Sequence, residues 1–465
     1  MVFLGNFALA RHGRVRKSFL LLASYFFYAQ WDPRFLILIW ISTAVDWFVG
    51  IGLGRSDDRK RRKILLGISL GVNLSLLGAF KYLDFFIEST AAMIEALGMN
   101  ADLHTLGLIL PVGISFYTFQ TLSYTIDIYQ RRIKPHDSPL DFALFVAFFP
   151  QLVAGPIVRA RNFLPQLANL RLPDRSDLSF GVYSICSGLF KKVILADLIG
   201  ATLAVPFYSE PGEYGTLGAI AGIYGFAFQL FGDFAGYSQI AIGCGALLGF
   251  RLPQNFDNPF MARNNLEIWR RWHITLLTWL RDYIYIPLGG SRGSNAQTYR
   301  NILITNFVSG IWHGAGINYV LWGLVNGLTI CFSRFYQGLR KVAGKTSEPG
   351  DPAFTIWAQR FLTFHLWLLA MPIFRTQSLE QLGEVGKALV RWEAPVAQHQ
   401  WLPLLGTVLL VVAFLQTITS EYQGDLIRRT WARLSPELQG GLFLIFLGLL
   451  GAFAPASSPF LYFQF

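Results

Sequence analysis

Long apolar runs with few charges are the feature that most restricts what this chain can fold into. Charged residues make up 14% of the 465 residues and hydrophobic residues 53%, whereas a soluble chain is about a quarter charged. A membrane-spanning helix needs roughly 20 predominantly apolar residues. The runs near that length are 18–31, 35–54, 64–87, 106–129, 180–207, 218–250, 301–332, 354–375, 401–419 and 440–463. They extend over the whole chain and predict an all-α, polytopic integral membrane protein with one membrane domain, residues 1–465.

Two of these runs are long for a simple span, and a further run is broken. The run 301–332 is expected to hold two passes or a bent pair of helices, and the run 218–250 is long enough to continue into a re-entrant piece. The run 141–158 contains two prolines and a glycine, so we expect a broken or re-entrant segment packed inside protein. The total becomes about 11 transmembrane helices, with re-entrant and amphipathic helices in addition.

Charge placement predicts the orientation. The net charge is +11, and Lys and Arg cluster in short loops between the apolar runs. Because such loops face the cytoplasm, the basic loops 55–63, 131–134 and 334–345 are placed on the cytoplasmic side, and the protein is expected in a bacterial inner membrane. The loops 88–105 and 208–217 carry acidic residues without Lys or Arg and are placed outside. This distribution also argues against a nucleic-acid-binding face.

The stretch 251–300 is polar, rich in Arg and Trp, and too charged to span a membrane. His273, Leu277, Leu280 and Ile284 share one helical face. We therefore expect an amphipathic helix that dips into the cytoplasmic side of the membrane. The structural alternative to a functional His273 is a histidine merely tolerated among interfacial Trp and Arg anchors.

His313 lies about a dozen residues into its apolar run, which corresponds to about 18 Å along a helix and places it near mid-membrane. Ionisable residues at that depth are costly and are functional candidates by default. Gly310, Gly314 and Gly316 surround it and would let other backbone or a ligand approach closely. A histidine hydrogen-bonded between helices is the structural alternative, and depth and glycines do not decide between the two.

Carboxylates within or beside the apolar runs keep a proton-coupled transporter open as an alternative function. They are Asp46, Asp127, Asp197 and Asp233. Gly232 and Gly236 are one helical turn apart, a spacing that favours close helix packing.

Other kinds of site have little support. Cys186, Cys244 and Cys331 lie far apart in apolar stretches, so neither a metal site nor a disulfide framework is expected. The serine motif GxSxG and the phosphate loop GxxxxGK[ST] are absent. His365 lies in an apolar run with nothing polar around it and is expected to be a packed histidine.

Several segments resemble the membrane-bound O-acyltransferase (MBOAT) family, specifically its AlgI-like alginate O-acetyltransferase branch, and are similar to DltB-type D-alanyl transfer proteins. They span most of the chain, are highly specific together, and concentrate in a motif-bearing core over residues 106–332. The segments are LPVGISFYTFQTLSYTIDIY at 110–129, FFPQLVAGPIVR at 148–159, FGDFAGYSQIAIGCGALLGF at 231–250, QNFDNPF at 254–260, RRWHITLLTWLRDYIYIPLGG at 270–290, NFVSGIWHGAG at 306–316 and PFLYFQF at 459–465.

The resemblance implies many tilted helices around a central tunnel, with an acyl donor entering from the cytoplasm and an acceptor approaching from outside. It identifies His313 as the family's essential histidine and His273 as the second histidine of the motif. The family usually begins with an apolar span before a basic stretch. Only MVFLGNFALA precedes the basic stretch 11–17 here, so a shortened first span is expected.

Acyl transfer from a thioester to a hydroxyl needs a base near the attacking oxygen and stabilisation of the oxyanion. Burial keeps an imidazole neutral and able to accept a proton, so His313 is the expected base. His273 would position the donor or donate to the oxyanion. The candidate substrate-binding residues are Trp312, Asn255, Asp257, Arg270, Arg271 and Arg281. The arginines would favour the phosphates of acetyl-CoA, the donor that the resemblance implies; no metal and no bound cofactor are expected.

The leading hypothesis is an O-acetyltransferase that serves O-acetylation of an exported polysaccharide such as alginate. The expected partners are acetyl-CoA or a carrier thioester, a periplasmic SGNH-type acetyltransferase, the exopolysaccharide machinery and membrane lipid. Two alternatives stay open. One is teichoic-acid-type D-alanyl transfer, which uses a carrier-protein thioester, and the other is the proton-coupled transporter of a solute or polysaccharide.

The charge asymmetry predicts that loop 88–105 lies outside and loop 55–63 inside. Single cysteines in these loops, on a background without the three native cysteines, should differ in labelling by an impermeant reagent applied to intact cells. Only the cysteine in 88–105 should react. Labelling of both loops from one side would contradict the orientation.

Overall fold

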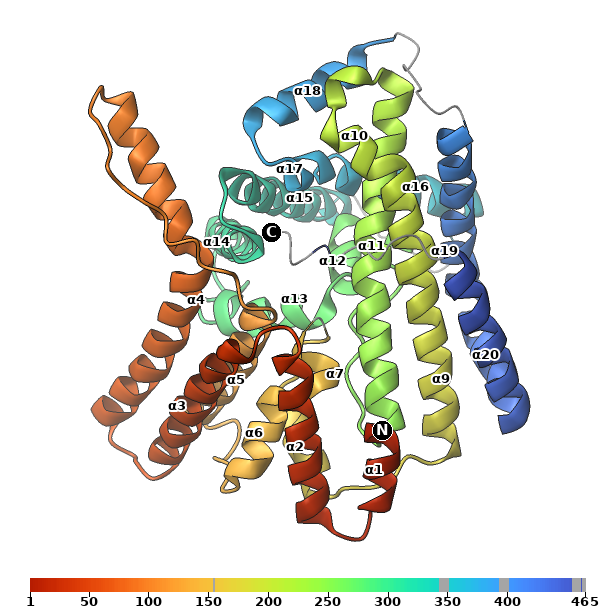
Figure 1. The fold of residues 1–465 in the computed structure, drawn as a ribbon. Coiled ribbons are helices and arrows are strands. Elements are labelled where there is room, and N and C mark those ends of the chain that lie inside the picture. Colours follow the sequence, from red (N-terminus) through yellow and green to blue (C-terminus); the bar gives the residue numbers. More distant parts are fainter. Residues whose placement is uncertain (154, 343–350, 393–400, 454–460, 462–465) are drawn as a thin grey trace. The chain divides into compact units, whose positions relative to one another are not determined.

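The computed structural model describes residues 1–465 apart from 154, 343–350, 393–400, 454–460 and 462–465. Every regular element in that part of the chain is helical, and none is a β-strand (Figure 1). The all-α prediction is therefore confirmed for these residues. The chain divides into two compact units. The first unit is Met1–Gly181 with Ala241–Pro253, and the second unit is Val182–Ile240 with Gln254–Phe465.

Helices that are long and apolar enough to cross a membrane occur in both units. Among the described residues there are four, namely Pro33–Gly54, Arg59–Ala96, Thr216–Leu247 and Leu404–Arg433. The other predicted spans form shorter or more polar helices, so the count of about 11 stays a prediction.

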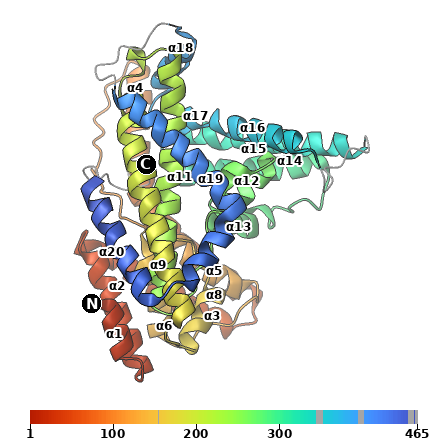
Figure 2. The same ribbon diagram turned by 90° about the vertical axis from the view of Figure 1, so that its right-hand side faces the viewer.

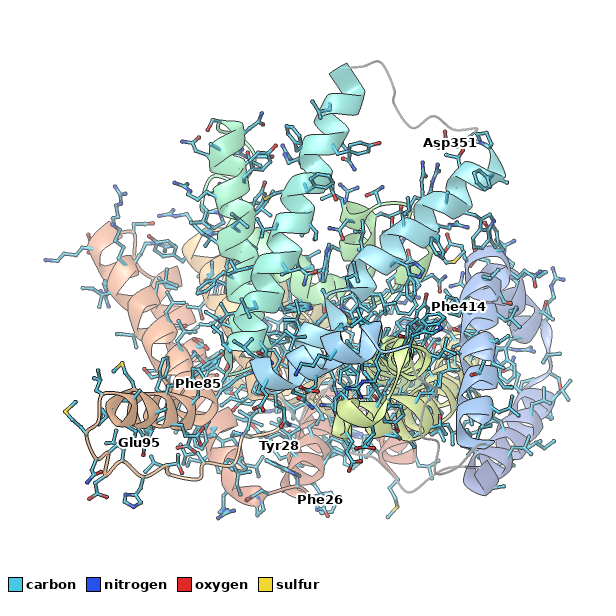
Figure 3. All side chains as sticks on the ribbon, turned by 90° about the horizontal axis from the view of Figure 1, so that it is seen from above. Phe26, Tyr28, Phe85, Glu95, Asp351 and Phe414 are labelled. Atoms are coloured by element: carbon cyan, nitrogen blue, oxygen red, sulfur yellow. The ribbon has the colours of Figure 1, made fainter. Side chains whose placement is uncertain are left out.

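The first unit packs short and long helices around an apolar core. Its helices are α1 (Val2–Ala8), α2 (Gly13–Ala29), η1 (Pro33–Phe35), α3 (Leu36–Gly54), α4 (Arg59–Ala96), α5 (Ile114–Tyr129), α6 (Pro139–Ala147), α7 (Phe149–Leu152), α8 (Ala160–Ala168) and the start of α9 (Arg175–Leu189). In its core the rings of Phe148, Phe163 and Phe250 pack with centroids between 4.8 and 5.3 Å apart. Tyr28, labelled in Figure 3, is buried and donates its hydroxyl to the Val112 carbonyl at 2.9 Å.

Two predicted runs of this unit are interrupted. The run 141–158 is broken as expected, between α6 and α7. The run 106–129 becomes helical only at Ile114, which the apolar pattern did not indicate. Gly113 before it has a φ of 76°, and a Cβ there would collide with the Leu152 carbonyl oxygen. The chain therefore enters α5 through a glycine turn pressed against α7.

The long helix α4 bears on the predicted orientation. Its N-terminus is capped by Asp58, whose carboxylate accepts from the backbone N–H of Arg61 at 2.8 Å. The 38 residues of α4 would extend about 57 Å, against roughly 30 Å for the hydrocarbon core of a bilayer. The segments 55–63 and 88–105 overlap the two opposite ends of this one helix, as their opposite charge would require, and their placement stays a prediction.

Two of the carboxylates that kept a transporter open have local partners in the first unit. Asp46 accepts hydrogen bonds from Asn73 Nδ2 at 2.8 Å and from Thr125 Oγ1 at 3.0 Å. Since these partners come from α4 and α5, the carboxylate ties three helices together. Asp127 pairs with Arg132 at 3.3 Å. These contacts fit a structural role.

The second unit contains the remaining helices and the histidines of interest. They are η2 (Phe190–Leu198), η3 (Gly200–Ala204), α10 (Val205–Ser209), η4 (Pro211–Glu213), most of α11 (Thr216–Leu247), η5 (Pro259–Met261), α12 (Asn265–Arg271), α13 (Ile274–Leu280), η6 (Arg281–Tyr285), α14 (Asn295–His313), α15 (Ile317–Val342), α16 (Ala353–Leu368), α17 (Met371–Arg375), α18 (Leu379–Val390), α19 (Trp401–Arg433) and α20 (Pro436–Phe453). Aromatic rings fill its core. Phe414 on α19, labelled in Figure 3, packs on Phe228 of α11 with centroids 4.8 Å apart.

The helices of this unit agree with some of the predicted apolar runs and divide others. The run 301–332 forms two helices as expected, α14 and α15, which lie side by side in both views (Figures 1 and 2). The run 218–250 is one helix, α11, and no re-entrant helix follows it within residues 248–258. The run 354–375 is divided into α16 and α17. The run 440–463 begins as α20, and its last part lies largely outside the described residues.

The glycine spacing around Asp233 produces the close packing that it predicted. Cβ atoms at Gly232 and Gly236 would come within 2.8 Å of carbonyl oxygens of the neighbouring chain segment, those of Lys191 and Gly188. That segment runs into η2, which is π-helical over nine residues, a conformation usually limited to a single turn. The wider π-helix and the bare glycine surface bring two backbones into direct contact.

This contact places a buried ion triad between η2 and α11. Lys192 Nζ lies 2.7 Å from the carboxylates of both Asp197 and Asp233. Their side chains are about a tenth exposed or less. The Leu461 backbone N–H donates to Asp233 Oδ2 at 2.7 Å. The two carboxylates thus share one lysine, which is a structural arrangement.

Replacing Lys192 by Met should destabilise the second unit strongly, because two buried carboxylates would lose their counter-charge. The expected loss is about 3–5 kcal/mol in the free energy of unfolding, seen as a lower thermal transition of the detergent-solubilised protein. Lys387→Met is the matched control, since Lys387 pairs with Glu384 at the surface. Equal transitions for the two variants would show that the triad contributes little.

Candidate active site

His273 lies at a break between two short helices. The chain ends α12 at Arg271, and a new helical stretch starts with α13 at Ile274 and continues through η6 to Tyr285. The helix expected for the face that begins at His273 is therefore present from Ile274, a break separates it from α12, and its position in the membrane stays a prediction. The reason for the break is the backbone of His273, whose φ of 40° and ψ of 51° are left-handed. This conformation is uncommon for a residue with a Cβ and persists only where the surroundings impose it. His273 is also buried, with 1% of its surface exposed.

The loop 254–260 imposes this break by pairing with the chain around it. The Asn255 carbonyl accepts from the Ile274 N–H at 2.9 Å, and the Asp257 N–H donates to the Arg271 carbonyl at 2.9 Å. The first N–H groups of a helix have no partner inside the helix, and here the loop supplies one. The two sequence motifs, QNFDNPF and RRWHITLL, therefore form one structural unit.

The side chain of Asn255 holds the His273 ring. Asn255 Oδ1 accepts from the Thr275 backbone N–H at 3.2 Å and from Thr275 Oγ1 at 2.8 Å, and lies 3.1 Å from His273 Nδ1. Asn255 Nδ2 donates to Ser238 Oγ at 3.0 Å, which orients the amide. Since Oδ1 can only accept, Nδ1 of His273 carries the proton and Nε2 carries the basic lone pair.

Burial keeps the His273 ring neutral. Desolvation lowers the pKa of His273 to about 3, because a charged imidazolium is disfavoured away from water. The neutral ring with its proton on Nδ1 can accept a hydrogen bond at Nε2 but cannot donate one there. Of the two roles considered for His273, positioning a donor fits this tautomer and donation to an oxyanion does not.

His313 is the last residue of α14 and lies where that helix turns into α15. Glycines let the two helices touch. A Cβ at Gly310 would collide with the Tyr319 carbonyl oxygen, and one at Gly323 with the Asn306 carbonyl oxygen. The close approach expected around His313 is thus confirmed at Gly310. Gly316 is different, since a Cβ there would meet the Tyr319 ring at an ordinary 3.6 Å.

Aromatic rings enclose His313, which is 5% exposed. The centroids of Trp312, Trp322 and Phe374 lie 4.8, 4.9 and 5.3 Å from that of His313, all in edge arrangements. The sequence did not single out Trp322 or Phe374. Trp322 lies in the apolar run that follows the WHG motif, whereas Phe374 comes from α17, and no local pattern links it to His313.

Trp312 joins the two histidines. Its ring centroid lies 5.9 Å from that of His273 and 4.8 Å from that of His313. The two imidazoles are therefore separated by at most the sum of these distances, although they come from different helices. The structure brings four predicted site residues, Asn255, His273, Trp312 and His313, into one buried cluster.

The other candidate residues are placed differently. Asn255 is buried against His273, whereas Asp257 and Arg270 are exposed. Arg271 forms ion pairs with Glu267 at 2.8 Å and Glu421 at 3.0 Å, and Arg281 pairs with its neighbour Asp282. No group of His, Cys, Asp or Glu side chains suited to a metal occurs among the residues that the structure describes.

Residues 129–371 match the family model of the membrane-bound O-acyltransferases, and this stretch includes both histidines. The chain belongs to the membrane-bound O-acyltransferase family. This acyltransferase is 37% identical to the probable alginate O-acetylase AlgI of Pseudomonas aeruginosa, over 89% of this chain and 78% of that protein. It is 32% identical to the peptidoglycan O-acetyltransferase of Helicobacter pylori, over 100% of this chain and 94% of that protein.

More distant similarity extends to a teichoic acid D-alanyltransferase of Streptococcus thermophilus, 29% identical over 57% of this chain and 68% of that protein. Together with the apolar helices, the family makes the protein a multi-pass membrane protein and an O-acyltransferase.

The packing of α14 on α15 predicts which glycines this membrane-bound O-acyltransferase needs. Gly310→Ala should lower acyl transfer about ten-fold or more, because the new methyl group would force α14 and His313 away from α15. Gly316→Ala should retain near-wild-type activity. The measurement is acyl transfer by equal amounts of membrane-inserted protein. Similar activity of both variants would contradict this account of the His313 position.

Proposed function

We propose that this acyltransferase transfers an acetyl group from a cytoplasmic thioester, acetyl-CoA, for O-acetylation of an exported polysaccharide. The observation that carries the proposal is the pair of buried histidines that both pack on the Trp312 ring. Two imidazoles within one enclosed cluster suit a reaction that needs one proton acceptor and one group to orient a reactant.

His313 is the proposed general base. It takes the proton of the attacking hydroxyl as the new carbon–oxygen bond forms. The carbon–sulfur bond then breaks, and the departing thiolate takes this proton from His313. The aromatic rings around His313 keep water away, which limits hydrolysis of the thioester.

His273 is the proposed positioning residue for the acyl donor. Its Nδ1–H is held by Asn255, so Nε2 can accept a hydrogen bond from the donor in one fixed direction. A neutral ring suits this task, because a charged one would not accept a hydrogen bond.

The setting of the reaction is inferred from the charge pattern and from the relatives. Arg270 is exposed and is the candidate contact for donor phosphates, whereas Arg271 and Arg281 already have acidic partners. We place the protein in a bacterial inner membrane, with about 11 helices around a tunnel that the donor enters from the cytoplasm. The AlgI relatives and the Helicobacter pylori relative carry names of O-acetyltransferases for alginate and peptidoglycan. A periplasmic SGNH-type acetyltransferase and the exopolysaccharide machinery are the proposed partners.

Acetyl transfer is favoured over the alternatives. Similarity to the AlgI relatives is higher and covers more of the chain than similarity to the D-alanyltransferases. A proton-coupled transporter would need titrating carboxylates along a path. Asp46, Asp127 and Asp233 instead bind neighbouring helices or basic side chains.

His313→Ala should lower acetylation of the polymer about a thousand-fold or more, which is the size of effect expected when a general base is lost. The variant protein should still insert into the membrane. His273→Ala should lower the rate less, and added thioester donor should restore part of it. The assay follows labelled acetyl from acetyl-CoA into polymer, in membranes from cells that make the polysaccharide.

His104→Ala is the matched control, because His104 is an exposed histidine far from the cluster in sequence. It should retain wild-type acetylation. Full acetylation by His313→Ala would make His313 structural and refute the mechanism. Transfer of D-alanine from a carrier-protein thioester in place of acetyl would instead establish the alternative acyl group.

A further inference from the structure

Arg375 is unusual among the arginines of this protein that are largely removed from solvent. It is the last residue of α17, and its guanidinium lies over the rings of Tyr208 and Phe226, with centroids 5.5 and 5.9 Å away. Among the described residues no carboxylate pairs with it, and its buried Nε makes no hydrogen bond. The Arg375 charge is therefore held by aromatic faces alone.

Three arginines that are more deeply buried have several oxygen partners. Arg16 donates to Asn6 Oδ1 at 2.7 Å and to backbone carbonyls, and Arg62 donates to a group of backbone carbonyls. Arg360 donates to the Met261 carbonyl at 3.1 Å and to the Tyr422 hydroxyl at 2.6 Å. Leaving a buried donor unsatisfied costs free energy, so the buried Nε of Arg375, which makes no hydrogen bond, points to a ligand that satisfies it.

The position of Arg375 connects it to the candidate active site. The preceding residue, Phe374, packs on the His313 ring with centroids 5.3 Å apart. Tyr208 adds a second polar group, since its buried hydroxyl has no hydrogen-bond partner among the described residues. The Tyr319 ring lies 5.5 Å from Phe374. The Arg375 guanidinium over the Tyr208 ring is thus one residue along the chain from the ring that contacts His313.

We propose that Arg375 and the Tyr208 hydroxyl form an anion subsite beside His313 that binds a carboxylate of the acyl acceptor. An Arg fork matches the two oxygens of a carboxylate, and a phenolic hydroxyl donates one further hydrogen bond to it. The single positive charge of Arg375 matches the single negative charge of a carboxylate. A donor with several phosphates would need several cations.

The surroundings of Tyr208 favour the acyl acceptor, rather than the acyl donor, as the source of the bound anion. Tyr208 lies near the end of α10, where the segment 208–217 begins, and this segment carries acidic residues and is predicted to lie outside the membrane. The Tyr208 carbonyl accepts from Gln381 Nε2 of α18 at 2.7 Å. The subsite is thus joined to the outer loop, the side from which the proposed acceptor approaches. This assignment of side rests on the proposed function, whereas the subsite itself rests on the contacts of Arg375.

A binding measurement tests the subsite independently of catalysis. The probe is D-glucuronate, with D-glucose as its uncharged match and acetyl-CoA as the probe for the donor, added to the purified full-length protein in detergent. Glucuronate, but not glucose, should raise the thermal transition of the wild type. Arg375→Met should weaken glucuronate binding about 10- to 100-fold, the range for a charge-assisted hydrogen bond, and leave acetyl-CoA binding unchanged.

Two further variants keep the test decisive if Arg375→Met fails to accumulate. Tyr208→Phe removes only the hydroxyl and should weaken glucuronate binding by a smaller factor, and Arg375→Lys should retain part of it. Arg428→Met, which alters a surface pair with Asp425, should bind glucuronate like the wild type. His313→Ala should also bind it, so loss of the base and loss of the subsite are told apart.

Other outcomes would overturn the proposal. If the Arg375 variants lose acetyl-CoA binding and keep glucuronate binding, the anion belongs to the donor and the acceptor assignment is wrong. If glucuronate does not stabilise the wild type, or stabilises Tyr208→Phe and Arg375→Lys as well as the wild type, no carboxylate subsite exists there.

Discussion

The oxygen of one asparagine side chain supports the geometry around His273. Asn255 Oδ1 is shared by the His273 ring and by both donors of Thr275. The Asn255 backbone carbonyl accepts from the Ile274 N–H, the first of α13. Irregular backbone inside a membrane protein is tolerated only where its polar groups find partners. Here the partners come from a loop that lies before α12 in sequence, so the break at His273 is held from outside its own segment.

A second constraint is direct backbone contact between helices. At α14 and α15 it depends on Gly310 and Gly323, and at η2 and α11 on Gly232 and Gly236. The first contact carries His313 and Trp312, and the second encloses Lys192 and its two carboxylates. Small residues make such approaches possible. Close packing matters inside a membrane because apolar burial there gives helices no hydrophobic driving force to associate.

The chemistry of the cluster follows from what these contacts exclude and orient. His273 is buried and neutral, with its tautomer set by Asn255. His313 is enclosed by rings from α14, α15 and α17. Rings on three helices bury His313, and burial in an apolar setting strengthens each polar interaction with a substrate. Arg375 is linked to this cluster, because the residue before it, Phe374, packs on the His313 ring.

The amino-acid sequence by itself determined the helical class, the division of 301–332 into two helices, the close packing at Gly232 and Gly310, and the choice of His273 and His313 as candidate site residues. These signals are local, since they depend on apolar run length, glycine spacing and short motifs. Only the tertiary structure decided that a left-handed His273 separates α12 from α13, that Asn255 orients the His273 ring, and that Phe374 reaches His313. Those features depend on contacts between segments distant in sequence, which no periodicity within one segment encodes.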